Sequence, residues 1–160
     1  MGNGRLGETR LHNDRLGPGL DGVRITLPGG DSPSRFIEIG KQLLRDNDLR
    51  RGEATLYMQV TRGATTRTHT FPSLDIAPTV YISAARFTPY LEFAEKGASA
   101  ISHPALRWGR CDLKTLHLLP NLRASQTAKE RGTLEAMPIR YVVVTRGTGT
   151  NAIGVVTGTV

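Results

Sequence analysis

Between Ala54 and Gly63 the sequence ATLYMQVTRG alternates apolar and polar side chains. Because successive side chains of a strand point to opposite faces, this alternation predicts a strand with one buried face. A second strand is predicted from Pro78 to Arg86, where the sequence PTVYISAAR is rich in β-branched and aromatic residues. A sheet with one apolar face needs other elements to cover it, so this part of the chain is expected to combine strands with helices.

The segment that follows Ser32 has the pattern of an amphipathic helix. Ser32 is a typical N-cap, and Pro33 is typical of a first helical turn. Apolar residues then recur at helical spacing up to a predicted end near Asn47 (Phe36, Ile39, Leu43 and Leu44). By contrast, the sequence LGPGLDG at 16–22 predicts no stable helix, because glycine costs about 1 kcal/mol and proline about 3 kcal/mol in a helix interior.

A new series of elements is predicted in the second half of the chain. A helix is expected over residues 121–131, with Pro120 in its first turn and Gly132 as its C-terminal stop. Shorter segments have the composition of strands: 23–28, 97–103, 141–145 and 152–156. We therefore expect an α+β fold, with a domain over residues 1–95 and the beginning of a second domain over residues 96–160.

The composition is that of a globular protein, with 38% hydrophobic and 22% charged residues and no apolar run long enough to cross a bilayer. Cys111 is the only cysteine, which suits a reducing, cytoplasmic compartment. The formal net charge is +7, but the 21 Lys and Arg are scattered and are not interleaved with aromatic residues. We therefore expect neither nucleic acid nor a membrane as partner; isolated arginines suit small phosphates and carboxylates.

Polar residues gather in three segments where predicted strands run into loops: HNDRL (12–16), VTRGATTRTHTFP (60–72) and RCDLKTLHLLPN (110–121). Taken singly, each segment has an ordinary explanation: Arg15 as a surface arginine, Arg67 and His69 as a solvated loop, and Lys114 as a snorkelling side chain. Together they resemble the class IV, fold-type IV aminotransferases that depend on pyridoxal 5'-phosphate, and most of all the D-amino acid aminotransferases. The segment VTRGTGTN (144–151) extends this resemblance.

The resemblance implies a D-amino acid aminotransferase-like fold and a role for each polar residue. Lys114 is expected to form the Schiff base with pyridoxal 5'-phosphate and to move the proton at the substrate Cα. Arg15 is expected to bind the cofactor phosphate, while Arg67 and His69 bind the substrate α-carboxylate. The implied reaction is transamination between a D-amino acid, such as D-alanine, and a 2-oxo acid. A homodimer is also implied, because in the family the loop with the R-x-H pair reaches into the partner's site.

Arg146 is the main departure from the family pattern. It stands where the family has a glutamate that holds a proton on the pyridine nitrogen, and a cation there disfavours that proton. We therefore expect Arg146 to contact the cofactor but to weaken transamination. Thr148 and Thr150, in the same turn, are expected to supply hydroxyls near the cofactor, and Trp108 is expected to form a wall of its pocket.

Two alternatives remain open at the level of sequence. The first is another class IV enzyme, either a branched-chain aminotransferase or an aminodeoxychorismate lyase, which the R-x-H pair disfavours. The second is a catalytically inactive remnant, which Arg146 favours. The resemblance also implies that the chain is a fragment, without the family's N-terminal strands and most of its C-terminal domain.

Overall fold

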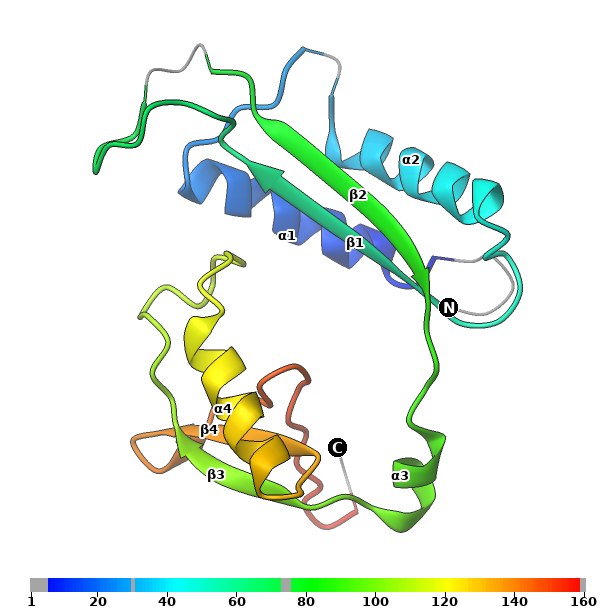
Figure 1. Cartoon of the computed structure of the whole chain (residues 1–160), viewed down its shortest axis with the longest axis vertical. Helices are drawn as coiled ribbons and strands as arrows, with labels where there is room; N and C mark the ends of the chain where they lie inside the picture. The colour runs from blue at the N-terminus through cyan, green and yellow to red at the C-terminus, as the bar shows by residue number, and fades with distance from the viewer. Residues whose placement is uncertain (1–5, 30, 73–75, 159–160) are drawn as a thin grey trace. The chain divides into compact units, whose positions relative to one another are not determined.

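Each half of the chain folds around a sheet of its own (Figure 1). The computed structural model describes residues 6–29, 31–72 and 76–158. Within it the chain divides into two units, Met1–Pro89 and Tyr90–Val160. The division predicted from the sequence, after residue 95, lies a few residues later.

The sheet of the first unit consists of two antiparallel strands, β1 (Ala54–Thr61) and β2 (Thr79–Arg86). Both predicted strands are thereby confirmed. Ala54 lies opposite Arg86, and the pairing continues without a bulge to the other end of the strands. Tyr57 and Tyr81 lie on the exposed face of this sheet, where their ring centroids are 6.2 Å apart.

Helix α2 (Pro33–Asp46) covers this sheet and confirms the prediction from Ser32 onward. The Ser32 hydroxyl accepts a hydrogen bond from the Arg35 amide at 3.3 Å, as expected of an N-cap. Phe36, on this helix, is almost completely buried. A Cβ added to Gly40 would overlap the side chain of Leu56, so the absence of a side chain allows α2 to pack closely on β1.

The prediction that residues 16–22 form no helix is wrong, because α1 (Thr9–Gly22) is a continuous helix that contains Pro18. Its conformational cost is offset by tertiary packing: α1 contacts α2, and Leu20 is buried. The Leu20 carbonyl also accepts hydrogen bonds from the amides of Val23 and Ile25, which closes the helix end. The predicted strand at 23–28 is wrong, because residues 23–24 form a turn and residues 25–28 have no regular secondary structure.

The second unit contains a mixed sheet with the strand order β3-β4-β5. β3 (Ala100–Pro104) is parallel to β4 (Glu135–Arg140), and the short β5 (Val143–Val144) is antiparallel to β4. Helix α4 (Leu119–Glu130) packs on β3 and β4. The buried core between them is small, because it consists of alanines with one isoleucine at its edge (Ala124, Ala128, Ala136 and Ile101).

Several predictions for this unit need correction. Strand β4 was not predicted, because Pro138 interrupts its pattern and proline is unusual in a central strand. The predicted strand at 141–145 is reduced to β5, since Tyr141 and Val142 form a turn with φ of 48° and 62°. No strand forms at 152–156 apart from a single bridge residue, Val156. The predictions of β3 and α4 are confirmed, and a short helix, α3 (Leu91–Lys96), was not predicted.

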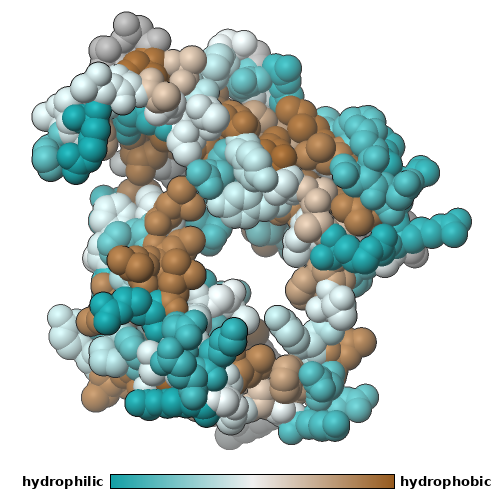
Figure 2. Space-filling view, viewed as in Figure 1, coloured by the Kyte–Doolittle hydropathy of each residue, from teal (hydrophilic) through white to brown (hydrophobic). Residues whose placement is uncertain are grey.

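Apolar side chains reach the surface in patches (Figure 2). In the second unit they include Tyr141 and Val142, which are 90% and 97% exposed. No helix within the described part of the chain is long and apolar enough to cross a membrane.

Candidate active site

Lys114 lies in the loop that connects β3 to α4, and its side chain is exposed. The neighbouring Leu113 is buried and anchors this loop to the unit. Two residues before the lysine, the Asp112 carboxylate accepts a hydrogen bond from the Arg110 guanidinium at 2.8 Å, which lowers the pKa of Asp112. The pair with Arg110 therefore favours the ionised form of a carboxylate two residues before Lys114.

Helix α4 begins shortly after Lys114 and is tied to the loop that contains Thr148. The buried Asn121 side chain donates a hydrogen bond to the Thr148 carbonyl at 2.8 Å. One turn further along α4, the Ser125 hydroxyl donates to the Thr148 hydroxyl, also at 2.8 Å. The lysine loop and the 145–150 loop are therefore fixed to the same helix.

The carboxylate of Glu135, at the start of β4, organises the 145–150 loop. Its Oε1 accepts hydrogen bonds from the Gly149 amide at 2.6 Å, the Thr148 hydroxyl at 3.0 Å and the Thr150 amide at 3.3 Å. Its Oε2 accepts from the Thr150 hydroxyl. Burial opposes ionisation of this carboxyl, but the hydrogen bonds together outweigh burial and lower its pKa.

Gly147 allows this arrangement. A Cβ at this position would lie 2.8 Å from the carboxylate carbon of Glu135 and would overlap the Thr150 hydroxyl. Only glycine leaves the space that the carboxylate occupies. The following glycine, Gly149, has no such restriction, because its added Cβ would lie 3.8 Å from Glu135.

Arg146, Thr148 and Thr150 are thus brought together in one loop of the second unit. The half-buried Arg146 donates a hydrogen bond from Nε to the Gly147 carbonyl at 3.0 Å. The hydroxyls of Thr148 and Thr150 are directed to Glu135. Their cofactor-binding roles stay predictions.

Sequence reasoning missed Glu135 and Asn121. The only available signal for Glu135 was a carboxylate at the start of a short apolar segment. Asn121 was visible in the helix pattern, but its partner lies 27 residues later in the chain.

The loop with Arg67 and His69 belongs to the first unit and follows β1. Both side chains are exposed. The base of the loop is held by Arg62, whose guanidinium donates to the carbonyls of Arg24, at 2.8 Å, and Val23. The same guanidinium lies 4.1 Å from the ring centroid of Phe71, a cation–π contact that joins the two ends of the loop.

Arg15 lies on α1 and is exposed, in the first unit. The predicted site residues are therefore distributed over both units: Arg15, Arg67 and His69 in the first, and Lys114, Arg146, Thr148 and Thr150 in the second. Trp108 is partly exposed and lies 6.1 Å from the ring of His117, measured between centroids.

Two buried polar atoms without a hydrogen-bond partner in the described part of the chain lie near Lys114 in the sequence. The Nε of Arg107 and the hydroxyl of Thr115 have no hydrogen-bond partner among the described residues. A buried donor without a partner costs free energy, so these groups suit contact with an acceptor that the chain does not supply. Within the described ranges, no group of His, Cys, Asp and Glu side chains is suited to hold a metal ion.

The fold is that of the class IV aminotransferases. The chain superimposes on a putative 4-amino-4-deoxychorismate lyase of Legionella pneumophila with a TM-score of 0.73 at 17% identity, over 92% of this chain and 53% of that one. It superimposes on the branched-chain amino acid aminotransferase of Escherichia coli with a TM-score of 0.71 at 21% identity, over 88% of this chain and 47% of that one. The expected α+β, aminotransferase-like fold is confirmed.

In sequence the chain resembles D-alanine aminotransferases, as expected. It is 30% identical to the D-alanine aminotransferase of Staphylococcus epidermidis over 158 residues, which cover 99% of this chain and 55% of the relative. It is 34% identical to the D-alanine aminotransferase of Listeria monocytogenes over 152 residues, which cover 93% of this chain and 51% of the relative. The chain spans about half the length of the curated relatives it matches. No family model matches it.

Proposed function

We propose that this chain is the part of a class IV, pyridoxal-phosphate-dependent aminotransferase that contains the reactive lysine. The single observation that supports this most strongly is the similarity to D-alanine aminotransferases over 99% of the chain. The solved neighbours support the cofactor, because a second branched-chain amino acid aminotransferase among them contains pyridoxamine 5'-phosphate, with a TM-score of 0.71 at 22% identity. The exposed thiol of Cys111 suits a cytoplasmic location.

The donor groups of the second unit fit such a cofactor. Lys114 has a primary amine on an exposed loop, suited to attach the cofactor aldehyde, and the unpaired donors of Arg107 and Thr115 suit its oxygen atoms. When bound, pyridoxal phosphate supplies an electron sink for the bonds at the substrate Cα. With the cofactor bound, the Lys114 amine would take the proton from the substrate Cα. Arg15 is proposed to bind the phosphate, since guanidinium binds two phosphate oxygens at once.

We propose a D-amino acid, such as D-alanine, and a 2-oxo acid as substrates. Arg67 and His69 lie two residues apart on an extended loop and supply the positive and hydrogen-bonding groups that bind an α-carboxylate. The same pair is proposed to act in the site of a second copy, in a homodimer. A branched-chain aminotransferase or an aminodeoxychorismate lyase remains the alternative, because both functions occur among the structural neighbours.

The test is a titration of the purified chain with pyridoxal 5'-phosphate, followed by borohydride reduction and peptide mass spectrometry. We expect a visible absorbance band and a phosphopyridoxyl group attached to Lys114. D-Alanine is expected to bleach the band, whereas L-alanine is expected to leave it unchanged.

The matched controls are Lys114→Ala, which should abolish both the band and the attachment, and Lys129→Ala, which should keep them. Lys129 is an exposed lysine of α4 in the same unit. Attachment at several lysines alike, or none at Lys114, would contradict the proposed cofactor role and favour an inactive remnant. Bleaching by L-alanine alone would contradict the substrate stereochemistry.

A further inference from the structure

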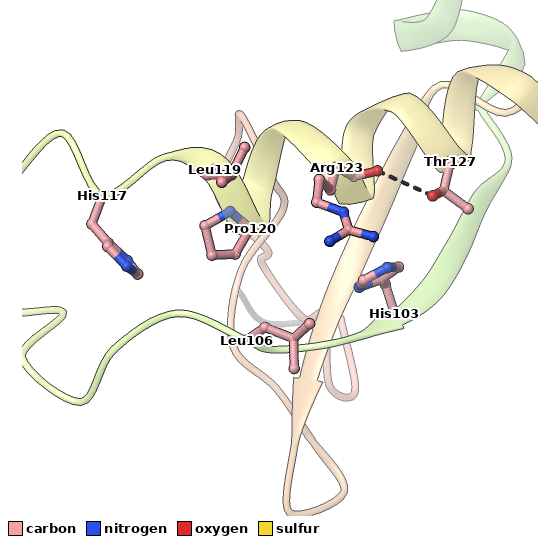
Figure 3. A pocket seen from close by; sticks show the side chains of 7 residues that line it. All are labelled: His103, Leu106, His117, Leu119, Pro120, Arg123 and Thr127. Atoms are coloured by element: carbon pink, nitrogen blue, oxygen red, sulfur yellow. Dashed lines mark hydrogen bonds between the residues drawn. The ribbon is translucent and has the colours of Figure 1, made fainter.

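A cavity of about 360 Å³ lies within the second unit, beside α4 (Figure 3). This volume is in the range of small-molecule sites. Helix α4, strand β3 and the loop between them form its walls, and none of the predicted catalytic or cofactor-binding residues lines it. The lining residues are His103, Leu106, His117, Leu119, Pro120, Arg123 and Thr127.

The polar part of this cavity is basic. The side chains of Arg123, from α4, and His103, from β3, lie together at one end of the cavity, whereas His117 lies at the other end, beyond Pro120 (Figure 3). No aspartate or glutamate is among the lining residues, and within the described part of the chain no carboxylate forms an ion pair with Arg123. The Arg123 guanidinium and the neighbouring His103 imidazole therefore face the cavity without an acidic counterpart among the described residues.

The remaining wall is apolar. Leu106 and Pro120 face each other across the cavity (Figure 3), and Leu119 is also among the lining residues. Leu106 and Leu119 are each 67% exposed, so water now covers apolar surface that a ligand would cover at a gain in free energy. A cavity with a basic end and an apolar wall favours ligands that have an anionic group and an apolar body.

We propose that this cavity binds a small monocarboxylate with an apolar body, with the carboxylate on Arg123 and His103 and the body against Leu106 and Pro120. Guanidinium is the side chain best suited to a carboxylate, since its planar fork can donate two parallel hydrogen bonds. A bare inorganic anion would leave the apolar wall uncovered. A neutral molecule of the same shape would lose the charged contact. Lys114 is not among the lining residues, and the proposed binding requires no cofactor.

Trp108 makes this proposal directly measurable. It is the only tryptophan in the chain, and its ring centroid is 6.1 Å from that of His117, which lines the cavity. Binding beside His117 changes the surroundings of the indole, so intrinsic fluorescence reports occupancy without any label.

The experiment titrates the full chain, without cofactor, with benzoate, benzamide and inorganic phosphate. Trp108 fluorescence and calorimetry are the readouts. Benzoate is expected to bind at least about tenfold more tightly than the neutral benzamide and more tightly than phosphate. Benzoate and benzamide with equal affinity would overturn the charged contact, and phosphate binding as tightly as benzoate would overturn the apolar one.

Arg123→Gln is expected to weaken benzoate binding by about tenfold or more, because the charged hydrogen bonds are lost. Arg131→Gln, an exposed arginine just after α4, removes the same charge outside the cavity and is expected to leave the affinity unchanged. An equal loss of benzoate affinity in the two variants would show that benzoate is attracted by the net positive charge of the chain and not by Arg123, and would overturn the proposal. Circular dichroism establishes that both variants remain folded, which they should since both side chains are exposed.

Discussion

Glu135 accepts hydrogen bonds from both the amide and the hydroxyl of Thr150, which lies fifteen residues later in the chain. The same carboxylate binds the amide of Gly149 and the hydroxyl of Thr148. One acidic side chain at the start of β4 therefore determines the conformation of the loop in which Arg146 lies. Its charge matters, since hydrogen bonds to an ionised acceptor are stronger than those to a neutral one.

Glu135→Gln is expected to destabilise the chain by about 1 kcal/mol or more at pH 7, because the amide replaces an ionised acceptor and faces several donors. The folded-state pKa of Glu135 is lowered, so its contribution is complete above the ordinary glutamate pKa and is lost as the pH falls through the lowered value. Urea unfolding of both chains at pH 7 and at about pH 3 checks this. A difference between the chains that stays constant or grows towards acid pH would contradict it.

Gly147→Ala is expected to destabilise the second unit by about 1–3 kcal/mol, because its Cβ would collide with the Thr150 hydroxyl and crowd Glu135. Gly149→Ala is the matched control, since its Cβ would lie at an ordinary 3.8 Å from Glu135. Thermal unfolding of the two variants measures the difference. Equal midpoints would mean that the loop does not pack on Glu135 as described.

Arg62→Lys is expected to loosen the loop that contains Arg67 and His69. Lysine cannot reproduce the two carbonyl contacts and the stacking on Phe71 that the planar guanidinium makes. Amide hydrogen exchange over residues 64–71 should become faster, and the KM for D-alanine in the active enzyme should rise by about tenfold.

Arg35→Lys is the control for this change, because Arg35 is an exposed residue of α2 that pairs with Asp31 in the same unit. It is expected to leave exchange in the 64–71 segment unchanged. A loop that exchanges equally fast in both variants and in the wild type would show that Arg62 does not hold it.

Arg146→Glu is expected to raise the rate of transamination, by about tenfold or more, if Arg146 occupies the place of the family's glutamate. A carboxylate there stabilises the proton on the pyridine nitrogen, whereas an arginine opposes it. Arg146→Gln separates the two effects, since it removes the positive charge without adding a negative one, and an intermediate rate is expected. No gain with glutamate would refute the assignment of Arg146 to the pyridine nitrogen.

A mixture of Lys114→Ala and Arg67→Ala chains tests the proposed dimer. If Arg67 acts in the partner's site, each mixed dimer has one complete site, and a random mixture recovers about a quarter of the wild-type activity. The result is followed by D-alanine turnover after refolding the two chains together. Activity no higher than that of the separate variants would place Arg67 and Lys114 of the same chain in one site, or show that no dimer forms.

Local sequence patterns were sufficient for much of the fold. Polar and apolar alternation predicted β1, and the Ser32–Pro33 pair predicted the start of α2, because these features act over a few neighbouring residues. Helix α4 was predicted for the same reason. The resemblance of short polar segments also indicated the fold and the D-alanine aminotransferase relatives, which the comparisons confirm.

Other features depended on contacts between distant residues, which no local pattern contains. Helix α1 forms despite Pro18 because it packs on α2, and β4 forms despite Pro138 because it lies between β3 and β5. Glu135 acquires its role only when the chain brings the 148–150 turn to it. The sequence by itself thus determined the elements whose stability is local and the resemblance to D-alanine aminotransferases. The tertiary structure decided which weak elements form and how the 145–150 loop is held, because both depend on contacts between distant residues.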